Sequence, residues 1–188
     1  MNNEHDEERI WSIIEVREVA DEVLREFFYD KEMPPTIFIR YRFYGKEWTL
    51  GSFFTSYGYG STSWDYVVEL RYTSMTRKVL RVVLIHELCH AYVAYNNLDC
   101  GKDHHRKAWR ILAKEMGERS GYVIQKYVTL EDSKNHSNLP RAESEEFFEW
   151  YHGDLDYIGS KLYPEVPSNE YRWGARVFPP KTHGEDTI

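Results

Sequence analysis

The first third of the chain begins with a long pattern of alternating charged and apolar positions. Across residues 4–30, apolar side chains recur three or four positions apart with charges between them. This spacing puts the apolar groups on one face of an amphipathic helix. Pro34 and Pro35 follow and are expected to end it, because proline removes a backbone donor and blocks the preceding turn. The pattern predicts an N-terminal helix with one buried face.

The next segments have a different pattern, which is typical of strands. They are rich in β-branched and aromatic residues, and glycine and serine clusters separate them. We predict three strands, at residues 36–43, 47–57 and 66–72, in a small twisted sheet that is antiparallel or mixed.

Two further helices are predicted after the strands. Residues 76–97 have the length of a helix and are mostly apolar around their middle, and residues 104–116 follow a loop that turns at Gly101. Asp103 is a candidate N-cap of the second helix, and Gly117 stands where a C-terminal cap glycine is expected.

The remainder of the chain gives weaker signals. Residues 122–130 are a candidate strand and residues 141–153 a short helix, and the last part is rich in proline and aromatic residues. We therefore divide the chain into a first unit, residues 1–130, and an acidic, aromatic extension, residues 131–188. The extension is predicted to pack on the core, with a flap over the cleft and a docking site for a partner as the alternatives.

Composition is that of a folded protein with a real core. Of 188 residues, 41% are apolar and 16% aromatic, which excludes a disordered chain. Two cysteines, Cys89 and Cys100, are too few for a disulfide framework or a four-cysteine zinc ribbon. The polar start lacks a secretory signal, and no membrane-length apolar run occurs. We expect an intracellular, cytoplasmic protein with no membrane contact, of a compact size that suits a bacterial or phage source.

The net charge of −7 is unevenly distributed. Residues 1–32 sum to −7 and residues 129–188 to −6, whereas residues 71–128 hold 11 basic and 5 acidic side chains. A basic middle segment suits a phosphate-rich partner, but acidic and basic segments also pair within one fold.

The predicted apolar helix carries three side chains that are costly to bury: His86, Glu87 and His90. Positions four apart lie on one helix face, so both imidazoles can bind one metal ion, and Glu87 lies beside them. This H-E-x-x-H arrangement is that of zinc peptidases, with two ligands and a general base. Burying these groups without partners costs several kcal/mol, and a metal ion satisfies them.

A catalytic zinc site needs a third protein ligand. Asn96 and Val93 stand where metzincins require a histidine and a glycine, which excludes that class. A glutamate on a later helix, as in gluzincins, leaves Glu115 and Glu118 open. His104 and His105 at the start of the next helix are the other candidates.

The segment HELCHAYVAYNNLDCGKDHHRKAW resembles the SprT-like, or Spartan, metallopeptidases. Their H-E-x-x-H-A helix is followed by a third histidine, commonly in H-G-x-x-[FW], which opens the next helix. His105 and Trp109 match that pattern, so the resemblance implies His86, His90 and His105 as ligands, with His104 the alternative. Arg106 replaces the usual glycine, and the four-cysteine ribbon of many relatives is missing.

The resemblance covers residues 5–125 and implies an α+β, zincin-like fold. It would consist of an N-terminal helix, a sheet of three to four strands and two metal-bearing helices, with a C-terminal extension. In such folds the strand before the metal helix, here residues 66–72, often lines the cleft and pairs with an extended substrate. The alternative is that it is an ordinary core strand.

The implied activity is a zinc-dependent endopeptidase in which Zn²⁺ activates water and Glu87 moves the proton. Family membership also implies protein substrates bound or crosslinked to DNA, hence a role in the repair of DNA–protein crosslinks. The alternative is a non-catalytic scaffold or interaction protein with a structural metal. The sequence indicates no oligomeric state. The candidate DNA-binding residues are Arg77, Lys78, Lys102, Arg106, Lys107 and Arg110.

Overall fold

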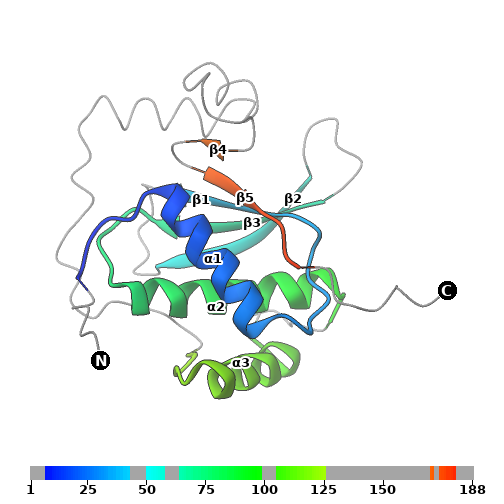
Figure 1. Ribbon diagram of the computed structural model, residues 1–188. Helices are drawn as coiled ribbons and strands as arrows, with labels where there is room; N and C mark the ends of the chain where they lie inside the picture. Colours follow the sequence, from blue (N-terminus) through cyan, green and yellow to red (C-terminus); the bar gives the residue numbers. More distant parts are fainter. Residues whose placement is uncertain are drawn as a thin grey trace.

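The computed structural model describes residues 7–42, 50–57, 64–98, 105–125, 170–171 and 174–180. Within these residues three helices and five strands form an α+β fold, which Figure 1 shows as a sheet with helices beside it. In chain order the elements are α1 (Ile13–Phe27), β1 (Ile37–Arg42), β2 (Gly51–Tyr57), β3 (Trp64–Arg71), α2 (Arg77–Tyr95), α3 (Lys107–Ser120), β4 (Glu170–Tyr171) and β5 (Gly174–Val177).

The sheet is mixed, and its strand order is β2-β3-β1-β5-β4. Strand β1 runs parallel to β3, whereas β2 is antiparallel to β3 and β5 is antiparallel to β1. The three predicted strands are therefore confirmed. A fourth strand, β5, pairs with β1 and comes from the far C-terminal part of the chain. The two-residue strand β4 pairs with β5.

Helices α1 and α2 pack on one face of the sheet, and α3 packs against α2 (Figure 1). The strand residues that face α1 and α2 are fully buried, among them Ile37 and Ile39 of β1 and Val68 and Leu70 of β3. Alternation along a strand places Phe38, Arg40, Val67 and Glu69 on the other face, and these are also buried. The sheet thus has two buried faces, and α2 lies on the first.

Helix α1 is shorter than the predicted range of residues 4–30. Ser12 is its N-cap, its hydroxyl accepts from the Glu15 amide, and the Glu15 carboxylate accepts from the Ser12 amide. This capping box satisfies two amides that a helix start leaves without partners. The helix therefore begins at Ile13, and the apolar pattern before it belongs to an extended segment that bridges to Met75 through Arg9.

Helix α3 ends four residues later than expected. Gly117 lies inside the helix, and the C-cap is Gly121, with φ of 71°. The assignment of Gly117 as the cap was wrong. Glycine tolerates this left-handed conformation without a Cβ penalty. Positions 117 and 121 both carry a glycine, so both were possible caps. At the other end the N-cap is Arg106, and Asp103 lies outside the described residues.

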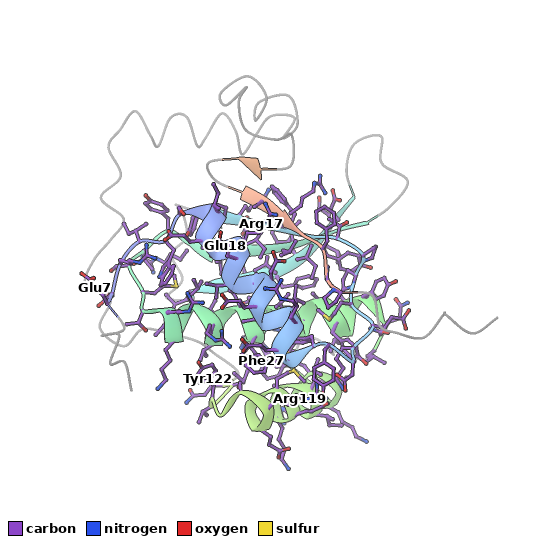
Figure 2. All side chains as sticks on the ribbon, viewed as in Figure 1. Glu7, Arg17, Glu18, Phe27, Arg119 and Tyr122 are labelled. Carbon is purple, nitrogen blue, oxygen red and sulfur yellow. The ribbon has the colours of Figure 1, made fainter. Side chains whose placement is uncertain are left out.

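The acidic N-terminal segment and the basic middle segment pair with one another. Glu22 of α1 lies 2.5 Å from Arg77 and 3.3 Å from Arg81 of α2, and Arg81 also pairs with Glu26. Figure 2 shows Arg119 of α3 near the end of α1, marked by Phe27, where Arg119 donates to the Phe27 carbonyl and to Asp30. Part of the positive charge of the middle segment is therefore neutralised by acidic side chains of the N-terminal segment.

Several predictions fall outside the described residues, among them the helix at residues 141–153 and Cys100. Residues 122–125 are not in a strand, and the rest of that candidate strand is not described. The division of the chain at residue 130 stays a prediction, although β5 is an integral part of the sheet. Among the described residues, none of the helices combines the length and apolar character required to cross a membrane.

Candidate metal centre

Helix α2 places His86, Glu87 and His90 in the interior. Its N-cap is Thr76, whose hydroxyl accepts from the Val79 amide, and its middle turns are almost entirely buried. His86 is 5% exposed and Glu87 is 4% exposed. One helical turn separates the two histidines, so both imidazoles project to the same side.

The third imidazole comes from His105, two residues before α3 begins. The three Nε2 atoms form a nearly equilateral triangle: His86 to His90 is 3.3 Å, His90 to His105 is 3.1 Å, and His105 to His86 is 3.2 Å. A tetrahedral ion with nitrogen ligands at 2.0–2.1 Å requires separations of about 3.3–3.4 Å. The donor set and spacing therefore fit one zinc-sized ion, and these three residues form a group that can hold a metal.

The orientation of His86 is set by a backbone carbonyl. Its Nδ1 donates to the carbonyl oxygen of Gln125 at 2.9 Å, because a carbonyl can only accept. The lone pair of the neutral ring is then on Nε2, which faces the other two histidines. Burial, helped by the nearby His105, lowers the pKa of His86 to about 4, against the opposing effect of the Gln125 carbonyl. His86 is therefore neutral near pH 7, as a metal ligand must be.

Aromatic rings enclose the three imidazoles. Trp109 of α3 is buried, and its ring centroid lies 4.8, 5.4 and 4.6 Å from those of His86, His90 and His105. Phe53 of β2 lies nearly parallel to His90, with centroids 6.3 Å apart. Packing of this kind restricts the ring rotamers and keeps water from the back of the site.

Glu87 lies against the first residue of β2. A Cβ built on Gly51 would be 2.6 Å from Glu87 Oε1 and 2.8 Å from a methyl group of Val83. Only glycine fits there without displacing Glu87. The carboxylate of Glu87 is thus held between α2 and the start of β2, one residue from the first histidine.

Comparison with known families identifies the domain. The SprT-like family model matches residues 59–129, which include β3, α2, the third histidine and α3. Residues 59–129 are a SprT-like family domain. Helix α1 and strands β1, β2 and β5 lie outside the match, so it is narrower than the predicted range of residues 5–125. No curated protein matches the chain.

Two of the remaining ligand candidates, Glu115 and Glu118, are separate from the three histidines of the SprT-like domain. Glu115 lies 2.8 Å from Lys31, which follows α1, and 2.5 Å from Arg119 on its own helix. Glu118 is largely exposed beside Lys114. Neither belongs to the group that can hold a metal. His104 lies outside the described residues.

The candidate DNA-binding residues fall into two groups. Arg106, Lys107 and Arg110 are exposed around the first turn of α3, and Arg110 Nε donates to the His105 carbonyl at 3.0 Å. Arg77 and Lys78 are exposed at the start of α2, where Arg77 pairs with Glu22. Lys102 lies outside the described residues.

The prediction that residues 66–72, in β3, pair with the substrate was wrong. Strand β3 has β1 on one side and β2 on the other, so its backbone groups are already hydrogen-bonded to these two strands. Strand β2 is the edge strand on this side of the described sheet, and it carries Gly51 and Phe53 next to the site. Neither of these residues nor the Gln125 carbonyl was predicted from the sequence, since no local pattern connects them to the histidines.

Proposed function

We propose that this protein is a zinc-dependent endopeptidase whose metal ligands are His86, His90 and His105 and whose general base is Glu87. The observation that carries the proposal is the triangle of three Nε2 atoms, 3.1–3.3 Å apart, beside a buried glutamate on the helix that carries His86 and His90. A structural zinc site is usually closed by four protein ligands, whereas three ligands leave a position for water. Glu87 is also the residue that a purely structural site would not need.

The side chains divide the reaction between them. When bound, zinc lowers the pKa of a coordinated water toward about 7 and polarises the scissile carbonyl. The Glu87 carboxylate accepts a proton from the attacking water and delivers it to the amine nitrogen of the leaving peptide. The aromatic enclosure of Trp109 and Phe53 keeps bulk water from the back of the imidazoles.

The substrate is proposed to bind as an extended segment along β2. An edge strand offers unpaired backbone donors and acceptors, and pairing with it gives affinity with little dependence on sequence. Phe53 of this strand lies beside His90, and Tyr66 of β3 continues the aromatic surface, with ring centroids 6.5 Å apart. A substrate strand next to β2 would therefore pass the metal ligands, and the surface favours apolar side chains there.

The test is the Glu87→Gln variant with Glu118→Gln as a matched control. Glu87→Gln is expected to keep its zinc and to lose about 10²- to 10⁴-fold in hydrolysis of an unfolded protein such as casein. Glu118→Gln, on the exposed face of α3, is expected to retain both its zinc and its hydrolytic activity. Zinc content and kcat/KM are measured on the same preparations.

The same experiment addresses the alternative, a non-catalytic scaffold with a structural metal. That reading predicts a wild-type protein that binds zinc stoichiometrically and is as inert as Glu87→Gln on every protein offered, with and without DNA. A metal-free wild-type protein would contradict both functions.

A finer proposal is that the substrates are proteins bound or crosslinked to DNA, which would make crosslink repair the biological role. It is supported by three exposed cations, Arg106, Lys107 and Arg110, within five residues of the third ligand. Phosphate contacts make binding salt-dependent, with a slope of about −0.9 per contact. Duplex binding that falls steeply with salt, and less steeply in Lys107→Gln, would support the proposal. An affinity for duplex DNA that does not change with salt concentration would contradict the proposal.

A further inference from the structure

The chain leaves α3 by a sharp turn and runs back along the helix. The amide of Gly121 donates to the Gly117 carbonyl at 2.9 Å, and the Tyr122 amide donates to Ser120 Oγ at 3.2 Å. We call residues 122–125 the strap. Tyr122 and Ile124 pack against the core while Val123 is 76% exposed, which is the alternation of an extended segment lying on a surface. Figure 2 shows Tyr122 at the junction of α2 and α3.

The strap lies unusually close to α3 at Gly117. A Cβ built on Gly117 would be 2.9 Å from the carbonyl oxygen of Tyr122, a distance that real Cβ atoms do not show. The atom it meets belongs to the backbone, so no side-chain rotation relieves the contact. Glycine is the weakest helix former after proline, and its presence inside α3 is explained by this approach.

The strap ends at the residue that orients the first metal ligand. The Gln125 carbonyl accepts from His86 Nδ1 at 2.9 Å, three residues after the contact between Tyr122 and Gly117. Partners of this kind fix the tautomer and ring orientation of ligating histidines, and their loss typically weakens metal binding 10- to 100-fold.

We infer that Gly117 is a positioning residue for the metal centre, which acts through the strap on His86. It touches neither the histidines nor the place of the metal. Its missing side chain lets the strap lie close enough to α3 for the Gln125 carbonyl to reach Nδ1. The strap and α3 also border a groove of about 730 Å³ that Lys114, Glu118 and Val123 line. A methyl group at position 117 would meet the Tyr122 carbonyl and push the strap away from α3.

The first test is Gly117→Ala, with Val123→Ala as the control on the strap. Gly117→Ala is expected to keep its helical circular dichroism, because alanine favours the helix. It is expected to bind zinc about 10- to 100-fold more weakly in competition with a chelator at fixed pH. Val123→Ala changes an exposed side chain of the same segment and is expected to bind zinc like the wild type.

A second readout separates positioning from general loss of structure. In the wild type, the His86 Nδ1 proton should be protected from exchange and visible by NMR. In Gly117→Ala that signal should be lost or shifted while the methyl signals of the core stay in place. Wild-type zinc affinity together with an unchanged Nδ1 signal in Gly117→Ala would overturn the inference.

A third variant keeps the inference testable if Gly117→Ala does not fold. Insertion of one glycine between Tyr122 and Val123 leaves α3 untouched and moves Gln125 out of register. It should weaken zinc binding to a similar degree, and unchanged binding would overturn the inference. The inference rests on the proposed zinc site, and different results would contradict the zinc site and the role of Gly117. A wild type without zinc removes both, whereas equal affinities of wild type and variants remove only the role of Gly117.

Discussion

Two buried polar clusters lie on opposite faces of the same sheet, and they are built on different principles. On the face away from α1 and α2, Arg40 of β1 donates from Nε and Nη2 to Oε1 of Glu69 on β3, at 3.0 and 2.8 Å. On the other face, three imidazole Nε2 atoms converge at 3.1–3.3 Å. The first cluster brings opposite charges together, and the second brings together three atoms of one kind.

The difference shows which buried polar groups indicate a ligand. Arg40 and Glu69 neutralise one another across neighbouring strands, and Ser52 adds a longer contact of 3.4 Å to Glu69. Such a pair is complete within the protein and has a structural role. Neutral imidazoles repel one another through their lone pairs at 3.2 Å, and a cation between them turns that repulsion into coordination. The histidine cluster is therefore the one that can hold a metal ion.

The largest expected effect comes from breaking the ion pair. Arg40→Ala leaves the Glu69 carboxylate buried without its partner, and we expect a loss of about 3–5 kcal/mol in the free energy of unfolding. Replacement of both residues by leucine is expected to recover most of that loss, since an apolar pair needs no desolvation of charge. Urea denaturation of the single and double variants measures both effects.

Zinc affinity is the control for this experiment. Because the ion pair lies on the far face of the sheet, the double leucine variant should bind zinc within about twofold of the wild type, given that distant sites are usually independent. If this variant instead loses zinc, the two clusters are coupled and the contrast between them does not hold.

The next effect is on metal binding. His105→Ala removes one of the three imidazoles and is expected to lower zinc affinity about 100-fold. Apparent zinc binding of about 10–16 kcal/mol, shared among the four ligands of a structural site, assigns about 2.5–4 kcal/mol to each. The metal-free protein should lose little stability, since His105 is only half-buried. Chelator competition and denaturation of the metal-free form provide the two measurements.

The neighbouring histidine provides a matched variant. We predict that His104→Ala keeps a zinc affinity close to that of the wild type. The reverse order, with His104→Ala as the weaker binder, would transfer the ligand role to His104 and contradict the geometry proposed for the site.

The smallest effect is expected for an exposed pair, which sets the scale for the buried one. Arg77→Ala breaks the contact with Glu22, where both side chains are partly exposed, and should cost at most about 1 kcal/mol. The difference from the wild type should vanish in 0.5 M salt, as the Debye length falls to a few ångströms. A loss comparable to that of Arg40→Ala would show that burial does not distinguish the two pairs.

Much of the metal site was determined by the sequence alone. The spacing of His86, Glu87 and His90 needs only the geometry of one helix turn, which is local and almost independent of context. The apolar neighbours Val83 and Leu84 indicated that this helix would be buried. The strands at residues 36–43, 47–57 and 66–72 followed from residue types in the same local way, and the resemblance to a known family indicated His105.

Only the tertiary structure decided which distant groups meet. The edge position of β2, the insertion of β5 beside β1 and the pairing of Arg40 with Glu69 depend on strand order, which no local pattern encodes. The choice between Gly117 and Gly121 as the helix end depended on where the following segment lies. Local geometry is set within a few bonds along the chain, whereas these contacts join residues whose separation in sequence carries no information about their distance in space.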